Sequence, residues 1–195
     1  MYSQKLRERY LEALSQRLTQ KRLQHSLGVE KMAGRLAREY GVSPEKAEIA
    51  GLLHDYAKYI PDDQMLRYAQ QFGIPLCSAY REKPNLLHGP VGAKLVQQEL
   101  GVEDQEILKA IEHHTTGAAG LGMLEEIIYL ADLLEENRDF EGVEELREML
   151  CKGADETMRC ALDRELAFLR SQGRTIHPDT AAAYEWMIQK KERQE

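Results

Sequence analysis

The sequence predicts an all-α protein of about nine or ten helices. Apolar residues recur at spacings of three and four along nearly the whole chain, whereas strand-like runs of β-branched or aromatic residues are few. Proline and glycine also punctuate this pattern as they do around helices. The helix starts are marked by Pro44, Pro90 and Pro178, and the helix ends by Gly41, Gly101 and Gly173.

In chain order, the periodicity predicts helices over residues 3–17, 20–40, 44–59, 62–72, 90–99, 103–114, 121–136, 143–151, 153–172 and 178–193. No internal repeat and no long linker interrupts them, so we expect one domain over residues 1–195. The three cysteines form no CxxC pair, which argues against a disulfide framework and a thiolate zinc site.

Charge and hydropathy exclude some classes of partner. The net charge is −7, from 26 Lys and Arg against 33 Asp and Glu, which argues against binding to nucleic acid or to an anionic membrane. No apolar run approaches the ~18 residues of a membrane span, and the charged start MYSQKLRERYLEAL does not resemble a signal peptide. We therefore expect a cytoplasmic protein whose size and helical content are compatible with a homodimer.

The second predicted helix, 20–40, places a histidine on its apolar stripe. His25 is in phase with Val29, Met32 and Leu36, and therefore faces the core. Taken alone, this is also the pattern of a hydrogen-bonded core histidine.

The third predicted helix, 44–59, contains the stretch GLLHDYAKYI at 51–60. Helix phase puts His54, Asp55 and Lys58 on one side, opposite Leu52 and its apolar neighbours, so all three can address one locus. Gly51 on the same side leaves room for a close approach. The alternative is a solvated polar face.

Two later helices add inward polar residues. In the helix 103–114, His114 shares a face with Ile107 and Ile111, whereas His113 points away. In the helix 121–136, Asp132 lies within a segment that is apolar on nearly every side. A carboxylate in that setting needs a metal ion or a cationic partner, such as an arginine from a neighbouring helix.

Two histidines precede proline at helix starts. His88 comes just before Gly89-Pro90, where its ring would lie near helix N-terminal amides, although on its own this position is more typical of an exposed loop histidine. His177 precedes Pro178, and its simplest interpretation is a local helix cap.

Considered together, these side chains form a metal-ligand set of nitrogen and oxygen donors without sulfur. Such a set suits iron, manganese, zinc or cobalt, and it is large enough for two ions with Asp55 as the bridge. The candidate ligands are His25, His54, Asp55, His88, His114 and Asp132.

The order of these residues resembles the HD-domain superfamily of metal-dependent phosphohydrolases. Nearly the whole chain is similar to the YqeK-type family of bacterial symmetrical bis(5′-nucleosyl)-tetraphosphatases. The phrases that carry the resemblance are RLQHSLGV at 22–29, AGLLHDYAK at 50–58, LLHGPVGA at 86–93, HHTTG at 113–117, YLADLLEENR at 129–138, GVEELR at 142–147 and TIHPDT at 175–180. Two positions depart from the pattern, Glu136 where proline is expected and His113 where an aromatic residue is expected, and neither is a candidate ligand.

The resemblance implies a helical bundle around a binuclear iron centre and the hydrolysis of diadenosine tetraphosphate to two ADP. His54, Asp55 and Lys58 are the candidate catalytic residues. Two metals would clamp phosphate oxygens and activate a water, so positioning and charge neutralisation carry most of the catalysis. The candidate substrate contacts are Lys58, His114, Thr115, Thr116, Gly117, Arg138 and, by resemblance, His177 in a nucleoside pocket.

Three other functions are compatible with parts of this pattern. Another HD phosphohydrolase, a nucleotidase or a cyclic-dinucleotide phosphodiesterase, would use the same metals on a different ester. A di-iron oxygenase on the same fold would depend on oxygen, and Lys58 and Arg138 argue against it because they favour anionic substrates. A non-catalytic nucleotide sensor would have lost ligands, whereas all the candidate ligands are present here.

Overall fold

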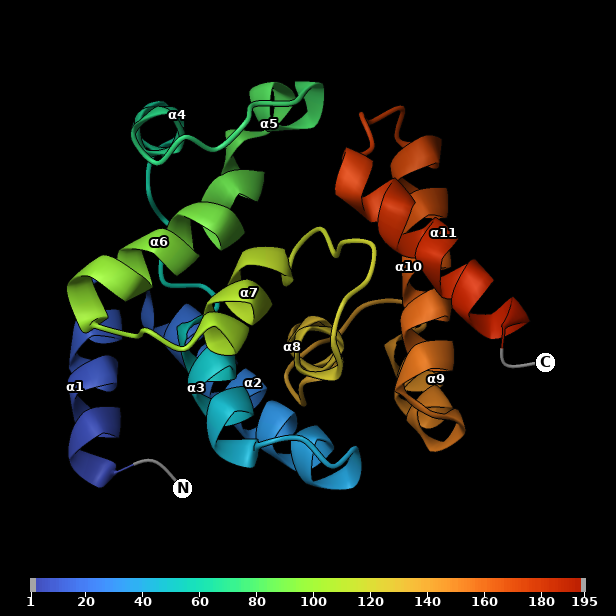
Figure 1. Cartoon of the computed structure of the whole chain (residues 1–195), viewed down its shortest axis with the longest axis horizontal. Helices are drawn as coiled ribbons and strands as arrows, with labels where there is room; N and C mark the ends of the chain where they lie inside the picture. Colours follow the sequence, from blue (N-terminus) through green and yellow to red (C-terminus); the bar gives the residue numbers. More distant parts are fainter. Residues whose placement is uncertain (1–2, 194–195) are drawn as a thin grey trace.

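The computed structural model describes residues 3–193, and in that range it contains α-helices, two 3₁₀ helices and no strand, which confirms the all-α prediction (Figure 1). The elements are α1 (Gln4–Ser15), α2 (Gln20–Glu39), α3 (Pro44–Leu53), α4 (Asp62–Gln71), α5 (Ser78–Glu82), η1 (Pro84–Leu87), α6 (His88–Leu100), α7 (Gln105–His113), α8 (Met123–Leu134), α9 (Val143–Met149), η2 (Leu150–Lys152), α10 (Ala154–Ser171) and α11 (Pro178–Glu192). No helix among the described residues is long and apolar enough to cross a bilayer.

Each predicted helix is present, and α5 is the additional one. The largest difference in boundaries lies in the third helix, which was predicted over 44–59 but ends at Leu53. Beyond it the chain tightens into i→i+3 turns, in which the Tyr56 amide donates to the Leu53 carbonyl at 3.0 Å and the Lys58 amide to the Asp55 carbonyl at 2.9 Å. His54 and Asp55 therefore lie on an irregular turn rather than on a helix face.

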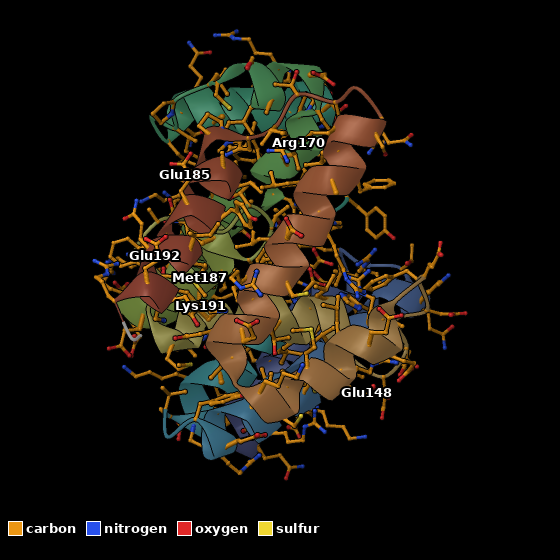
Figure 2. The ribbon with its side chains drawn as sticks, turned by 90° about the vertical axis from the view of Figure 1, so that its right-hand side faces the viewer. Glu148, Arg170, Glu185, Met187, Lys191 and Glu192 are labelled. Carbon is orange, nitrogen blue, oxygen red and sulfur yellow. The ribbon has the colours of Figure 1, made fainter. Side chains whose placement is uncertain are left out.

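The helix α8 lies in the middle of the molecule and joins its two sides (Figure 1). It packs against α2, α3 and α7 on one side and against α10 on the other. The α10–α11 pair forms the second side, where Met187 is buried and Arg170 and Glu185 face solvent (Figure 2).

Two glycines allow the helices that carry the polar cluster to approach each other closely. A Cβ at Gly51 would lie 3.0 Å from the Val29 carbonyl oxygen, and one at Gly89 would lie 2.5 Å from the Glu112 carbonyl oxygen. The free side of Gly51 is thus filled by the α2 backbone. This packing draws the end of α3 onto α2, and the start of α6 onto α7.

Candidate metal centre

The structure brings the predicted metal ligands to one locus. His25 comes from α2, His54 and Asp55 from the turn after α3, and His88 from the first residue of α6. His114 follows α7, and Asp132 lies near the end of α8. Their donor atoms form three overlapping groups, each within 4.8 Å: His25, His54 and Asp55; His54, His114 and Asp132; and Asp55, His88 and His114.

Asp55 lies between two sets of histidines. Its Oδ2 is 3.3 Å from His54 Nε2 and 3.9 Å from His25 Nε2. Its Oδ1 is 3.2 Å from His88 Nε2 and 3.8 Å from His114 Nε2. Each carboxylate oxygen therefore faces its own pair of ring nitrogens, which is the arrangement that a bridging carboxylate needs.

Asp132 completes the first of these sets. Its Oδ1 lies 2.9 Å from His25 Nε2 and 3.7 Å from His54 Nε2. The side chain is 21% exposed, which makes it the most accessible of the candidate ligands.

The orientation of all four imidazoles is fixed by their second ring nitrogen. Nδ1 is within hydrogen-bond distance of an acceptor oxygen in every case, so in the neutral ring Nδ1 carries the proton and the lone pair of Nε2 points at the centre. The partners are Gly51 O for His54 at 2.7 Å, Asn85 O for His88 at 2.5 Å, Ile111 O for His114 at 2.7 Å and Glu135 Oε1 for His25 at 3.0 Å.

The centre contains more inward lone pairs than protons to share among them. Among the residues that the structure describes, the buried Nε2 atoms of His25 and His54 and the Oδ1 of Asp55 have no hydrogen-bond partner. In addition, His88 Nε2 and His114 Nε2 lie 3.0 Å apart, both as acceptors. Such groups are costly to bury unless cations lie between them, so the donor set fits metal ions.

The electrostatics hold Asp55 and His114 in the protonation state that metal binding requires. His54 differs, because burial would lower its pKa but the neighbouring Asp55 carboxylate outweighs burial and raises it. Burial on its own would raise the pKa of Asp55, but His54 and His88 outweigh it and hold that pKa well below its usual range. Burial and the neighbouring histidines His88 and His54 also push the pKa of His114 well below its ordinary value. The carboxylate is therefore ionised and the His114 imidazole neutral at physiological pH.

Three cationic side chains surround the centre. Lys58 Nζ lies 3.0 Å from His88 Nε2 and 3.4 Å from Asp55 Oδ1. Arg138 donates from Nε to the Asp132 carbonyl at 2.7 Å and also contacts the Asp132 carboxylate. The third, Arg22, donates to Asp55 Oδ2 at 2.9 Å and was missed by the sequence analysis, although it lies one helical turn before His25 on the same side of α2.

The segment after His114 contributes one hydroxyl to the centre. Thr115 Oγ1 lies 3.1 Å from His88 Nε2 and 3.0 Å from His114 Nε2. The Thr116 hydroxyl instead bonds the Gly117 carbonyl, and the Gly117 amide donates to the His113 carbonyl at 2.8 Å. Of these three candidate substrate contacts, the structure brings only Thr115 to the centre.

Two cavities lie beside this segment. One of about 270 Å³ is lined by Tyr80, His113, Thr116 and His177, and one of about 190 Å³ by Thr115, Thr116 and Glu165 among others. His177 caps α11 by accepting from the Asp179 amide at 3.2 Å, and its ring packs on Tyr80 with centroids 4.4 Å apart. The His177 ring therefore caps α11, as the sequence suggests, and also lines the cavity.

The adjacent histidines differ as helix phase predicts. The His114 side chain is fully buried at the centre, whereas that of His113 is 25% exposed and its Nδ1 lies 2.7 Å from Glu125 Oε1. His113 therefore takes no part in the cluster.

Comparison with known proteins identifies the family. The HD domain model matches residues 22–155. The symmetrical bis(5′-nucleosyl)-tetraphosphatase of Bacillus subtilis is 38% identical over 93% of this chain and 97% of its own length, and that of Staphylococcus aureus is 36% identical over 85% and 86%. A crystal structure from Clostridium acetobutylicum, described as a predicted HD superfamily hydrolase involved in NAD metabolism, has a TM-score of 0.91 and 36% identity over 97% of this chain and 99% of that one. The chain therefore belongs to the HD-domain family, in the group that contains the proteins named symmetrical bis(5′-nucleosyl)-tetraphosphatase.

Proposed function

We propose that the chain hydrolyses diadenosine tetraphosphate symmetrically into two molecules of ADP. The observation that carries this proposal is the centre itself: two sets of inward nitrogen and oxygen donors bridged by Asp55, with Lys58, Arg138 and Arg22 around them. Metal ions and fixed cations at one locus suit a polyanionic substrate. The choice of substrate follows the names of the similar proteins in Bacillus subtilis and Staphylococcus aureus.

The proposal assigns the candidate ligands to two ions. His25, His54, Asp132 and Asp55 Oδ2 would hold one, and His88, His114 and Asp55 Oδ1 the other. When bound, the ions would polarise phosphoryl oxygens as Lewis acids and supply hydroxide at neutral pH. We propose iron, and the donor set also accommodates manganese, cobalt and zinc.

The surrounding side chains supply positioning and charge. Lys58 and Arg138 would move from their present carboxylate contacts to phosphate oxygens, Arg138 through its bidentate fork. Arg22, which reaches Asp55 from α2, would add a third positive charge. Thr115 would donate its hydroxyl from the side of His88 and His114. These contacts neutralise the charge that builds up on the leaving diphosphate.

Symmetrical cleavage breaks the central anhydride of the tetraphosphate chain. The water oxygen joins one of the two middle phosphorus atoms, and the bridging oxygen leaves with the other half, so that two ADP result. We place the nucleoside in the cavity beside Tyr80 and His177, because its aromatic lining lies next to Thr116 in the segment that follows His114.

The test begins with anaerobic purification and metal analysis. Diadenosine tetraphosphate is then hydrolysed in ¹⁸O-labelled water, and the products are separated by chromatography and examined for the label. The proposal requires ADP as the only nucleotide product, with the label in half of its molecules. Production of AMP with ATP would contradict symmetrical cleavage. Faster turnover of a mononucleotide or a cyclic dinucleotide in the same panel would instead favour the nucleotidase or phosphodiesterase alternative.

A further inference from the structure

The turn between α8 and α9 carries two side chains that reach the candidate metal centre. Glu135 is 1% exposed and holds Nδ1 of His25 at 3.0 Å. Arg138, three residues later, contacts Asp132 through both its carboxylate and its carbonyl. The position of the 135–138 turn therefore decides how one ligand ring is oriented and where one guanidinium lies.

The side chain that fixes the backbone of this turn comes from α9. Arg147 donates from Nε to the Leu134 carbonyl at 2.9 Å, and from Nη2 to the Glu135 carbonyl at 2.6 Å and to the Arg138 carbonyl at 3.0 Å. Leu134 and Glu135 stand at the C-terminal end of α8, where carbonyls lack partners within the helix. Arg147 thus caps α8 and ties both ends of the turn together.

The turn has little freedom on its other side. Glu135 Oε2 accepts from the Asn137 amide at 2.8 Å and from Asn137 Nδ2 at 2.9 Å. Glu135 is also seated directly on α2, since a Cβ at Gly28 would lie 2.4 Å from its Oε2. Because the Glu135 side chain is confined in this way, a shift of the turn backbone would change the hydrogen bond between Glu135 and His25.

We infer that Arg147 is a positioning residue for the metal centre, acting through Glu135 on His25 and through the turn on Arg138. The inference rests on the proposed metal centre and extends it to a residue that touches no candidate ligand. Arg147 reaches the three carbonyls from two nitrogens, Nε and Nη2, held in one plane, whereas a lysine would have to reach them from a single ammonium nitrogen. This gives a physical role to the arginine of the GVEELR motif, which the sequence analysis left without one.

The chain offers a matched control. Arg164 on α10 also binds α9, donating to the Gly142 carbonyl at 2.9 Å and contacting Glu145, but it makes none of the Arg147 contacts to the turn. Arg147 likewise contacts an exposed carboxylate on α9, that of Glu144. Replacing either arginine by methionine removes one ion pair to a carboxylate on α9 together with hydrogen bonds to backbone carbonyls. Only Arg147→Met removes the hydrogen bonds to the 135–138 turn.

The experiment is a Co²⁺ titration of the metal-free full-length protein, followed by cobalt absorption, for wild type, Arg147→Met, Arg164→Met, Glu135→Gln and the Arg147→Met/Glu135→Gln double variant. We expect Arg147→Met to weaken Co²⁺ binding about tenfold, as losing an outer-shell partner of a ligand does. Arg164→Met should bind like wild type. The double variant should bind Co²⁺ no more weakly than the single variant with the lower affinity, because both changes act on the same Glu135–His25 hydrogen bond.

Unchanged affinity in Arg147→Met, equal losses in Arg147→Met and Arg164→Met, or additive losses with Glu135→Gln would each overturn the inference. If Arg147→Met does not fold, Arg147→Lys replaces it, with an expected affinity between those of wild type and Glu135→Gln. Co²⁺ binding needs no substrate, so failure to cleave diadenosine tetraphosphate would count against the proposed function alone. Wild-type protein that bound no Co²⁺ would overturn the metal centre and this inference together.

Discussion

The helix α8 carries an inward carboxylate near each end, Glu126 and Asp132, and the two carboxylates have different partners. Near its start, Glu126 is paired with Lys190, whose Nζ lies 2.9 Å from Glu126 Oε1 and 2.7 Å from Asp155 Oδ1. Near its end, Asp132 faces the ring nitrogens of His25 and His54. At the first end a lysine of the chain pairs with the carboxylate. At the second end Arg138 contacts Asp132, and the other groups that face this carboxylate are the ring nitrogens of His25 and His54.

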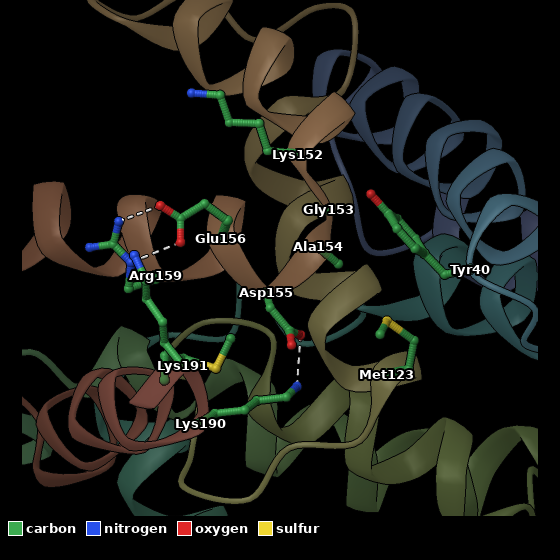
Figure 3. A pocket seen from close by; sticks show the side chains of 11 residues that line it. Tyr40, Met123, Lys152, Gly153, Ala154, Asp155, Glu156, Arg159, Lys190 and Lys191 are labelled. Carbon is green, nitrogen blue, oxygen red and sulfur yellow. Dashed lines mark hydrogen bonds and ion pairs between the residues drawn. The ribbon is translucent and has the colours of Figure 1, made fainter. Parts of the chain in front are cut away.

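The difference shows that the size of a cavity does not identify the site. The Lys190 end opens into a cavity of about 530 Å³, lined by ion pairs that satisfy one another, such as Glu156 with Arg159 (Figure 3). One atom there, Glu126 Oε2, also has no hydrogen-bond partner within residues 3–193, but burial raises the pKa of Glu126 to about 7, so a proton can neutralise this carboxylate. At the other end, three atoms that lack a hydrogen bond within the described part of the chain converge on one locus, which favours metal ions instead.

Replacing the bridging carboxylate should have the largest effect. Asp55→Ala removes one carboxylate oxygen from each half of the centre. We therefore expect the metal content to fall and turnover to drop by at least about 1000-fold, while the helical circular dichroism is retained. Metal analysis and ADP formation on one sample measure both. Full activity in metal-depleted Asp55→Ala protein would end the proposal.

The next largest effect concerns Glu126, at the other end of α8, and is a change in how the free energy of unfolding depends on pH. Burial, opposed by Lys190 and reinforced by Asp155, raises the pKa of Glu126 from 4.5 to about 7. Because the folded pKa exceeds the unfolded one, its stabilising contribution is complete below pH 4.5 and is lost as pH rises to about 7, at most about 3 kcal/mol. Denaturant unfolding of Glu126→Gln should lack that loss.

The control for this measurement is Glu185→Gln, on the exposed face of α11 (Figure 2), which should keep the wild-type slope. A Glu126→Gln slope equal to that of wild type would mean that another group titrates in this window.

Removing the cation at the same end should separate stability from chemistry. Lys190→Met leaves Glu126 and Asp155 without their shared partner, and we expect a loss of about 2 kcal/mol, below the usual range for a buried pair because the lysine side chain is 28% exposed. Activity for each folded, metal-loaded molecule should stay within about twofold. The comparison fails if folded Lys190→Met protein loses activity or if its melting temperature is unchanged.

The smallest effect belongs to a cation at the edge of the metal centre. Lys58→Ala should lower kcat/KM about tenfold, because one charge-assisted phosphate contact is lost, while the metal content stays that of wild type. Steady-state kinetics with metal analysis provide the measurement. Unchanged kinetics would make Lys58 a structural residue.

Sequence periodicity predicts those parts of the site that depend on helix phase. It places His25 inward and separates His114 from His113, because a regular helix fixes which way each side chain points. It fails over 54–59, where i→i+3 turns replace the helix, and it misses α5, which at five residues is too short to show a period. Even so, the turn keeps His54, Asp55 and Lys58 at one locus.

Contacts between residues that are far apart in the sequence are harder to predict from it. Glu135 meets His25 across a separation of 110 residues, and no pattern in either segment indicates the pairing. The role of Arg147 depends on where the carbonyls of a turn point, which side-chain periodicity does not encode. Arg22 is different, because it lies on the same side of α2 as His25 and could have been predicted.

The most direct test of the central claim is anomalous diffraction from crystals of anaerobically purified, metal-loaded protein. The two-ion centre predicts two peaks, one among the Nε2 atoms of His25 and His54 and the Asp132 carboxylate, and one beside His88 and His114, with Asp55 between them. Metal peaks elsewhere, such as beside Glu126 and Asp155, with none at this centre in crystals of active protein, would contradict it.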